Sequence, residues 1–328
     1  MIDDKKTALK LNEKLLSKYG ENPLVNLALA KVDDNKTLVE AISNKLIENK
    51  ETLVLGLKGL IELNEGVDDT KALVYANQAF KETKLPWALK SAVRLMIKNG
   101  LYEDALKSLD GNKKLISQEE FKEVKVSLLM KLSENEAKKE KYLNEVIKLD
   151  YTFVPAYISL ASFYKDKGKD NKALKCLKKA YQTNPDIMIY DYVEKNLCGD
   201  GDIIKITKEL IEDNLNNDVS TLILARSHMK AGIFGQALNY FKEYLVNNAP
   251  NTKIALFMAK LEKEMGNLKE VEKWNNAILN AEFDGKYRCE KCGFEYSSWQ
   301  ASCDNCGSFS SIKWSDLNSK SKEIVAYN

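Results

Sequence analysis

The sequence contains very little histidine and arginine. Its 328 residues include one histidine, His228, and three arginines, Arg94, Arg226 and Arg288. A single imidazole excludes two-histidine metal sites and leaves almost no partner for a serine or cysteine nucleophile. The net charge of only +2 and the scarcity of guanidinium groups argue against phosphate and base recognition. We therefore expect a protein that is not an enzyme and binds no nucleic acid.

The sequence also lacks long apolar stretches and has few cysteines for its length. No stretch reaches about 18 consecutive apolar residues, the length that a membrane-spanning helix needs. The first residues, MIDDKKTALK, mix acidic and basic side chains and do not resemble a secretion signal. Six cysteines are too few for a disulfide scaffold. These absences predict a cytoplasmic protein that meets a membrane only through a partner or an N-terminal anchor absent from this chain.

Helical periodicity dominates the chain up to about residue 280. Apolar residues recur at spacings of three and four, and short segments around Gly100, Gly168, Gly232 and Gly266 separate the blocks. Alignment on these glycines gives a period of 34 residues, which is typical of tetratricopeptide repeats with two antiparallel helices each. The clearest repeats cover residues 86–119, 154–187, 218–251 and 252–282.

The repeat at 154–187 matches the motif best. The matching residues are Tyr157, Leu160, Ala161, Tyr164, Gly168, Ala173, Leu177, Ala180 and Pro185. The alanines allow the two helices to approach closely, and the larger residues fill the seam between neighbouring hairpins. At the N-terminus, Ala8, Leu11 and Leu15 resemble a second repeat helix, so either an upstream helix is absent from this sequence or the first helix is an unusual cap.

These patterns predict an all-α fold, a tetratricopeptide-like solenoid of helical hairpins with a small C-terminal metal module. We expect the helical domain at 1–282, a zinc-ribbon or rubredoxin-like module at 283–316 and a tail at 317–328.

The C-terminal module carries the strongest chemical signal. Four cysteines form two CxxCG turns, which are Cys289, Cys292, Cys303 and Cys306. Two residues between paired cysteines place both thiolates on one face of a tight turn, and two facing turns complete a tetrahedral sulfur shell. Four thiolates without an open position indicate a structural site for zinc, with rubredoxin-type iron as the alternative. The remaining interpretation is that these four cysteines form two disulfides.

Apolar residues around the cysteines predict how the module is shielded. They are Phe294, Tyr296, Trp299, Phe309, Ile312 and Trp314. We expect them to cover the metal and to dock the module onto the last helical hairpin.

Residues 53–110 resemble the signature region of the HemY family. The matching motifs are LGLKGL, LPWAL and a hairpin that ends at Asp110, within an N-terminal-like region of about 1–110. Some HemY members also end in a module whose pattern Gly293, Trp299, Gly307, Phe309 and Trp314 reproduce. The resemblance implies a bacterial helical-repeat protein associated with heme biosynthesis at the inner membrane. It implies association with the pathway and no catalysis.

The module is also similar to that of the LapB family. This second resemblance rests on YRCEKCGF, SIK and the ten-residue gap between the cysteine pairs. It implies a regulator of lipopolysaccharide assembly that acts through a membrane protease. An alternative of another class is a porphyrin carrier or a redox sensor based on the thiolate site.

Repeat positions that line the inner groove of a solenoid are mostly basic. They are Lys90, Arg94, Lys98, Lys165, Arg226, Lys230, Lys260 and Lys263. We predict that this groove captures a protein or peptide partner with acidic character, and the alternative is a solvated lysine-rich face. His228 occupies a seam position of its repeat, so we expect it to pack in the core. Cys176 and Cys198 are expected to be small buried residues.

Overall fold

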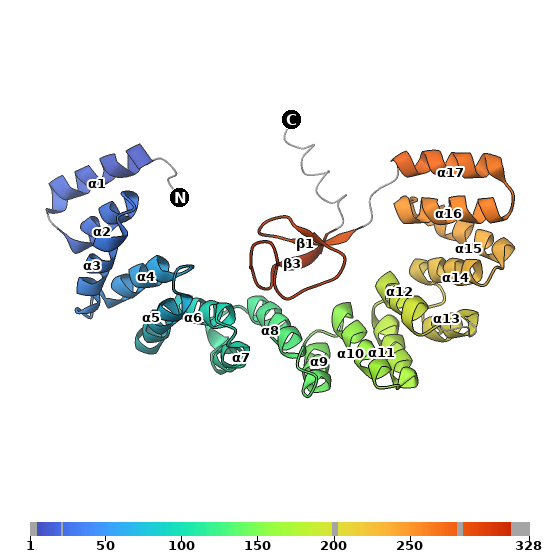
Figure 1. The fold of residues 1–328 in the computed structure, drawn as a ribbon, viewed down its shortest axis with the longest axis horizontal. Helices are drawn as coiled ribbons and strands as arrows, with labels where there is room; N and C mark the ends of the chain where they lie inside the picture. The colour runs from blue at the N-terminus through green and yellow to red at the C-terminus, as the bar shows by residue number, and fades with distance from the viewer. Residues whose placement is uncertain (1–4, 21, 199–202, 281–284, 316–328) are drawn as a thin grey trace. The chain divides into compact units, whose positions relative to one another are not determined.

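A computed structural model describes residues 5–20, 22–198, 203–280 and 285–315. Helices follow one another through 5–280, and the strands of the described residues lie between 286 and 315 (Figure 1). The chain divides into two compact units, Met1–Leu128 and Leu129–Asn328, with the boundary inside α8 (Gln118–Leu132). The proposed tail at 317–328 lies outside the described residues.

The first unit is a series of helices in which each packs against the next. The helices are α1 (Lys5–Tyr19), α2 (Pro23–Val32), α3 (Lys36–Ile47), α4 (Leu53–Asn64), α5 (Asp69–Thr83), α6 (Pro86–Lys98) and α7 (Tyr102–Gly111), followed by a short 3-10 turn, η1 (Lys113–Leu115). Side chains of Asn22, Asn35 and Asp68 accept hydrogen bonds from the first turns of α2, α3 and α5. These caps fix where the helices begin.

The second unit stacks helical hairpins. Its helices are α9 (Lys139–Leu149), α10 (Val154–Asp166), α11 (Asp170–Thr183), α12 (Ile187–Asn196), α13 (Ile203–Ile211), α14 (Asp218–Lys230), α15 (Phe234–Asn247), α16 (Thr252–Glu264) and α17 (Leu268–Asn280). The first helices of successive hairpins contact each other, since α12 touches both α10 and α14. Helix α13 packs against α11 and α14, so α12 and α13 continue the stack in a region where the repeat motif is not visible in the sequence.

Four turn glycines adopt the left-handed conformation that the repeat alignment requires. The φ angles of Gly100, Gly168, Gly232 and Gly266 lie between +66° and +80°. The sequence prediction of helical hairpins whose two helices are joined at these glycines is therefore confirmed.

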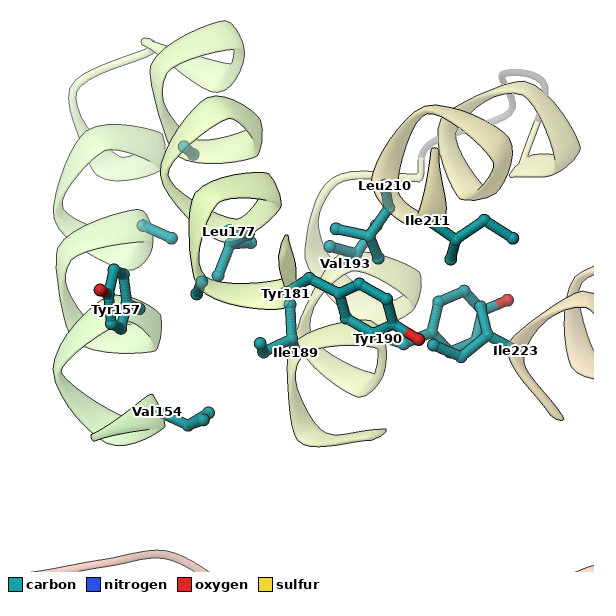
Figure 2. Packing of buried hydrophobic residues seen from close by; sticks show 13 residues of the cluster. Val154, Tyr157, Leu177, Tyr181, Ile189, Tyr190, Val193, Leu210, Ile211 and Ile223 are labelled. Atoms are coloured by element: carbon teal, nitrogen blue, oxygen red, sulfur yellow. The ribbon is translucent and has the colours of Figure 1, made fainter. Parts of the chain in front are cut away.

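The core of the second unit is built from small residues inside hairpins and aromatic residues between them. Ala161 and Ala173 are fully buried where α10 meets α11. Tyr181 and Tyr190 fill the space towards Leu210 and Ile211 of α13 and Ile223 of α14 (Figure 2). The Tyr181 hydroxyl is satisfied by Ser220 Oγ at 2.8 Å. The predicted all-α, tetratricopeptide-like fold is confirmed by this packing.

The C-terminal module is a three-stranded antiparallel sheet in the order β2, β1, β3. The strands are β1 (Lys286–Cys289), β2 (Glu295–Tyr296) and β3 (Ile312–Ser315). Tyr287 pairs with Tyr296 on one side and with Trp314 on the other, and Cys289 pairs with Ile312. This register brings the first cysteine turn next to the segment that follows the second.

Candidate functional site

Two matching turns present the four cysteines. Gly293 and Gly307 have φ angles of +75° and +68°, and their N–H groups donate to the carbonyl oxygens of Cys289 and Cys303, both at 2.8 Å. A side chain at either glycine would be strained in this conformation. The turns therefore have the same local structure, as the repeated CxxCG pattern predicts.

The four sulfur atoms form one cluster of metal-site dimensions. All four lie within 4.8 Å of one another, with Cys289 Sγ 3.8 Å from Cys306 Sγ and Cys292 Sγ 3.5 Å from Cys303 Sγ. A metal–sulfur bond of about 2.3 Å in a tetrahedron requires sulfur separations of about 3.8 Å. A disulfide requires about 2.05 Å, and all four cysteines are free thiols. The donor set fits a four-coordinate metal ion, which would complete the shell without an open coordination position.

Hydroxyl groups surround the sulfur atoms. Ser308 Oγ lies 3.3 Å from Cys289 Sγ and 3.0 Å from Cys306 Sγ, and Ser311 Oγ lies 3.3 Å from Cys289 Sγ. On the other side, the Tyr296 hydroxyl donates to Cys303 Sγ at 3.1 Å. Sequence reasoning assigned no role to either serine, although the serine-rich segment SFSS directly follows the second turn.

These donors change the acidity of the thiols. Burial disfavours the charged thiolate of Cys289, but the nearby polar hydroxyls of Ser308 and Ser311 and backbone N–H groups outweigh burial and lower the pKa of Cys289 to about 5. Burial likewise opposes ionisation of Cys303, yet the Tyr296 hydroxyl and two backbone N–H groups lower its pKa. Thiolates are the form that binds metal, so the environment prepares these sulfurs for coordination.

Within the second unit, the module contacts α12 and the residue that precedes α10. The Tyr287 hydroxyl lies 3.5 Å from Met188 Sδ on α12. The ring of Trp299 meets that of Phe153, the residue before α10, edge to face at 5.1 Å and 87°. The expected docking onto the last hairpin, α16–α17, is wrong, because these apolar contacts lie at α12 and before α10, two and three helix pairs earlier in the chain. Phe294 and Trp314 remain about half exposed and pack on Tyr296 and Tyr287 inside the module.

The predicted groove residues of the first unit are held in ion pairs. Lys90 pairs with Glu120 at 2.6 Å, Lys98 pairs with Glu65 at 2.9 Å, and Arg94 also contacts Glu65. These lysines and the arginine are therefore partly neutralised by Glu120 on α8 and by Glu65, which directly follows α4.

In the second unit, Arg226 is a structural residue. Its guanidinium donates to Asp191 and Glu194, each at 2.6 Å, and lies between the rings of Tyr190 and Phe257, at 4.9 and 5.2 Å from their centroids. Its side chain is only 10% exposed. Burial opposes the charge, but the two carboxylates outweigh burial and raise the pKa of Arg226 above its usual value.

The remaining predicted groove residues of this unit differ in their surroundings. A hollow of about 630 Å³ lies between α12, α14 and α16 and is lined by Arg226, Lys230, Lys260 and six further side chains, Glu194, Lys195, Met229, Phe234, Phe257 and Glu264, with Gly232. Lys263 is exposed on α16 outside this lining, and Lys165 lies 3.5 Å from Asn196 Oδ1. The structure thus brings Arg226, Lys230 and Lys260 together.

We expect replacement of Arg226 by alanine to destabilise the second unit. Removing one member of a buried ion pair costs about 3–5 kcal/mol, and because Asp191 and Glu194 are partly exposed we expect about 2 kcal/mol. Urea denaturation measures the loss, with Lys269→Ala on the exposed surface of α17 as the control. Equal stability of the two variants would contradict the structural role.

His228 and the two isolated cysteines have packing roles. His228 is buried, its Nδ1 lies 2.8 Å from the carbonyl oxygen of Leu224, and its ring packs against Tyr240. The expected core position of His228 is therefore confirmed. Cys176 and Cys198 both pack against the core of the second unit but are half-buried and not fully buried as expected, and burial raises the pKa of the Cys176 thiol to about 11.

Comparisons with known proteins return solved structures, two of which are named as tetratricopeptide repeat proteins. The chain is similar to a tetratricopeptide repeat protein from Parabacteroides merdae, with 12% identity, a TM-score of 0.30 and coverage of 84% of this chain and 92% of that one. It is also similar to the C-terminal part of a TPR repeat-containing protein from Cytophaga hutchinsonii, with 15% identity, a TM-score of 0.38 and coverage of 69% and 94%. The human IFIT1 dimer with m7Gppp-AAAA has 14% identity, a TM-score of 0.34 and coverage of 85% and 74%. No family model and no curated protein matches the chain.

The assignment of the fold therefore rests on the stacked hairpins and their turn glycines. In the described residues, no helix has both the length and the apolar character needed to cross a membrane.

Proposed function

We propose that the chain is a non-catalytic scaffold that holds a protein or peptide partner in the hollow between α12, α14 and α16. The observation that carries this proposal is the combination of apolar floor and basic rim in that hollow. Met229, Phe234 and Phe257 supply the apolar surface, while exposed Lys195, Lys230 and Lys260 supply the charge. Helical-repeat solenoids commonly bind extended segments on such concave surfaces.

The charge of the hollow favours an acidic partner. The charges of Arg226 and Glu194 offset each other. The remaining charged side chains of the lining are the three lysines and Glu264, so the hollow has an excess of positive charge. Of the lysines, Lys230 donates to the backbone carbonyl oxygen of Glu194 at 2.9 Å, which is an uncharged acceptor. A peptide with carboxylates next to apolar side chains would match both features.

Charge reversal at the rim tests this proposal. We expect the double variant Lys230→Glu and Lys260→Glu to bind a fluorescein-labelled decapeptide of alternating glutamate and phenylalanine about tenfold more weakly, which corresponds to about 1.4 kcal/mol. Fluorescence anisotropy measures the affinity, and Lys269→Glu is the matched control at an exposed lysine of α17. Unchanged binding by the double variant would refute the proposed groove.

The finer assignment follows the sequence resemblances. We propose a HemY-like adaptor associated with heme biosynthesis at the cytoplasmic face of the bacterial inner membrane, on the basis of the motifs at 53–110. The alternative is a LapB-like regulator, which the four-cysteine module with its ten-residue gap favours. The proposed domains are the helical repeats at 1–282 and the module at 283–316. We propose zinc as the metal and iron as the alternative.

An absorption spectrum of the purified protein separates these assignments. A colourless protein with bound zinc supports the scaffold, whereas iron–thiolate bands indicate a rubredoxin-type site. A Soret band would instead support the porphyrin carrier and contradict the proposal.

A further inference from the structure

The hydroxyl of Ser308 bridges one edge of the sulfur cluster. It lies 3.0 Å from Cys306 Sγ and 3.3 Å from Cys289 Sγ, while these two sulfurs are 3.8 Å apart. The edge joins a buried cysteine to an exposed one, since Cys289 is buried and Cys306 faces solvent. Ser308 therefore lies where a competing ligand in solution would reach the metal–sulfur bonds.

Ser311 fixes the direction of the Ser308 proton. The two hydroxyl oxygens are 2.6 Å apart, so one hydroxyl must donate to the other. The shortest oxygen–sulfur contact is that of Ser308 with Cys306, which assigns the order Ser311 to Ser308 to Cys306. Ser311 is buried, and a buried chain of hydroxyls holds its members in one orientation.

A four-thiolate site needs such donors. Four thiolates around a divalent metal leave a net charge of about −2, and hydrogen bonds to sulfur offset it. The backbone of Ser308 has a separate role, because its carbonyl oxygen accepts from the N–H of Cys303 at 2.8 Å. An alanine at this position keeps the backbone bond and removes only the hydroxyl.

We propose that Ser308 is a positioning residue of the metal centre: its hydroxyl, oriented by Ser311, donates to the Cys306 thiolate and slows metal loss from the exposed edge. This role concerns the module alone and is independent of the partner-binding groove.

The test uses the full chain loaded with Co²⁺, a spectroscopic substitute for a tetrahedral metal. We expect Ser308→Ala to transfer its metal to a chromogenic chelator about tenfold faster than the unchanged chain. We also expect the sulfur-to-cobalt charge-transfer band to move to longer wavelength, because loss of a hydrogen bond raises the energy of the sulfur electrons. Ser308→Thr retains a hydroxyl and should restore both values. Ser297→Ala, at an exposed serine of the same module, should match the unchanged chain.

Each outcome decides the proposal. A faster transfer and a shifted band in Ser308→Ala, both reversed in Ser308→Thr, support it. An unshifted band in Ser308→Ala overturns it even if metal is lost faster, because a packing defect alone would leave the sulfur electrons unchanged. If Ser308→Ala binds no cobalt, Ser311→Ala provides the same two measurements, and an unshifted band there overturns the proposal.

Discussion

Removal of the metal by a chelator under reducing conditions should unfold the C-terminal module and leave the helices intact. The described part of the module spans only residues 285–315, and a segment of this size buries too little apolar surface to fold alone. Structural zinc sites contribute about 10–16 kcal/mol of binding free energy, which becomes folding free energy in such modules. We therefore expect release of about one metal ion per chain and complete loss of the sheet.

Three signals follow this transition. Trp299 should lose its contact with Phe153, which changes the tryptophan fluorescence. Far-ultraviolet circular dichroism should retain its helical signal. Four thiols should become reactive, while Cys176, with a pKa of about 11, should remain slow.

Two cysteine variants provide the comparison for this experiment. Cys303→Ser should reproduce the chelated state without chelator, and Cys176→Ser should behave like the unchanged chain because Cys176 lies outside the sulfur cluster. A metal-free chain with a folded module would contradict this account of its stability.

Replacement of Gly56 by alanine should cause the largest loss of stability in the first unit. A Cβ at this position would lie 2.6 Å from the carbonyl oxygen of Ser43 and 2.9 Å from the backbone N of Ile47, so the backbones of α3 and α4 would have to separate. Overpacking of a core costs about 1–3 kcal/mol, and because these clashes involve the backbone we expect about 3 kcal/mol. Thermal or urea denaturation measures the change.

Gly111 offers the matched control. It ends α7, and a Cβ there would meet no atom within 4 Å. Gly111→Ala should therefore be neutral or stabilising by up to about 1 kcal/mol. Similar stability of the Gly56→Ala and Gly111→Ala variants would contradict the close approach of α3 and α4.

Gly59 allows a sharper version of the same experiment. A Cβ at Gly59 would clash with Ser43 Oγ but would lie 3.4 Å from Ser43 Cβ. Ser43→Ala should therefore restore most of the stability that Gly59→Ala removes. Since Ser43 Oγ is buried and has no hydrogen-bond partner among the described residues, Ser43→Ala alone should not destabilise the protein.

The sequence predicted the parts of this structure that depend on local pattern. Gly168 and the glycines at the same repeat position adopt the left-handed turns between helices. Ala161 and Ala173 are fully buried where two helices pack closely. The CxxCG spacing alone predicted the clustered cysteines, because two residues between ligands fix the geometry of the turn.

Contacts between distant segments could not be predicted in the same way. Tyr287 meets Met188, which is 99 residues away in the chain, and nothing in either local sequence specifies the other. The pairing of Arg226 with Asp191 and Glu194 depends on the stacking of α12 against α14. A basic residue at a groove position therefore had two possible roles, ligand contact and ion pairing, that periodicity does not distinguish.

X-ray absorption at the metal edge tests the central claim most directly. That claim is a helical scaffold whose metal centre is a closed shell of Cys289, Cys292, Cys303 and Cys306. The account predicts a single shell of four sulfur atoms at about 2.3 Å. A shell that contains oxygen or nitrogen, or a sulfur count below four, would contradict it.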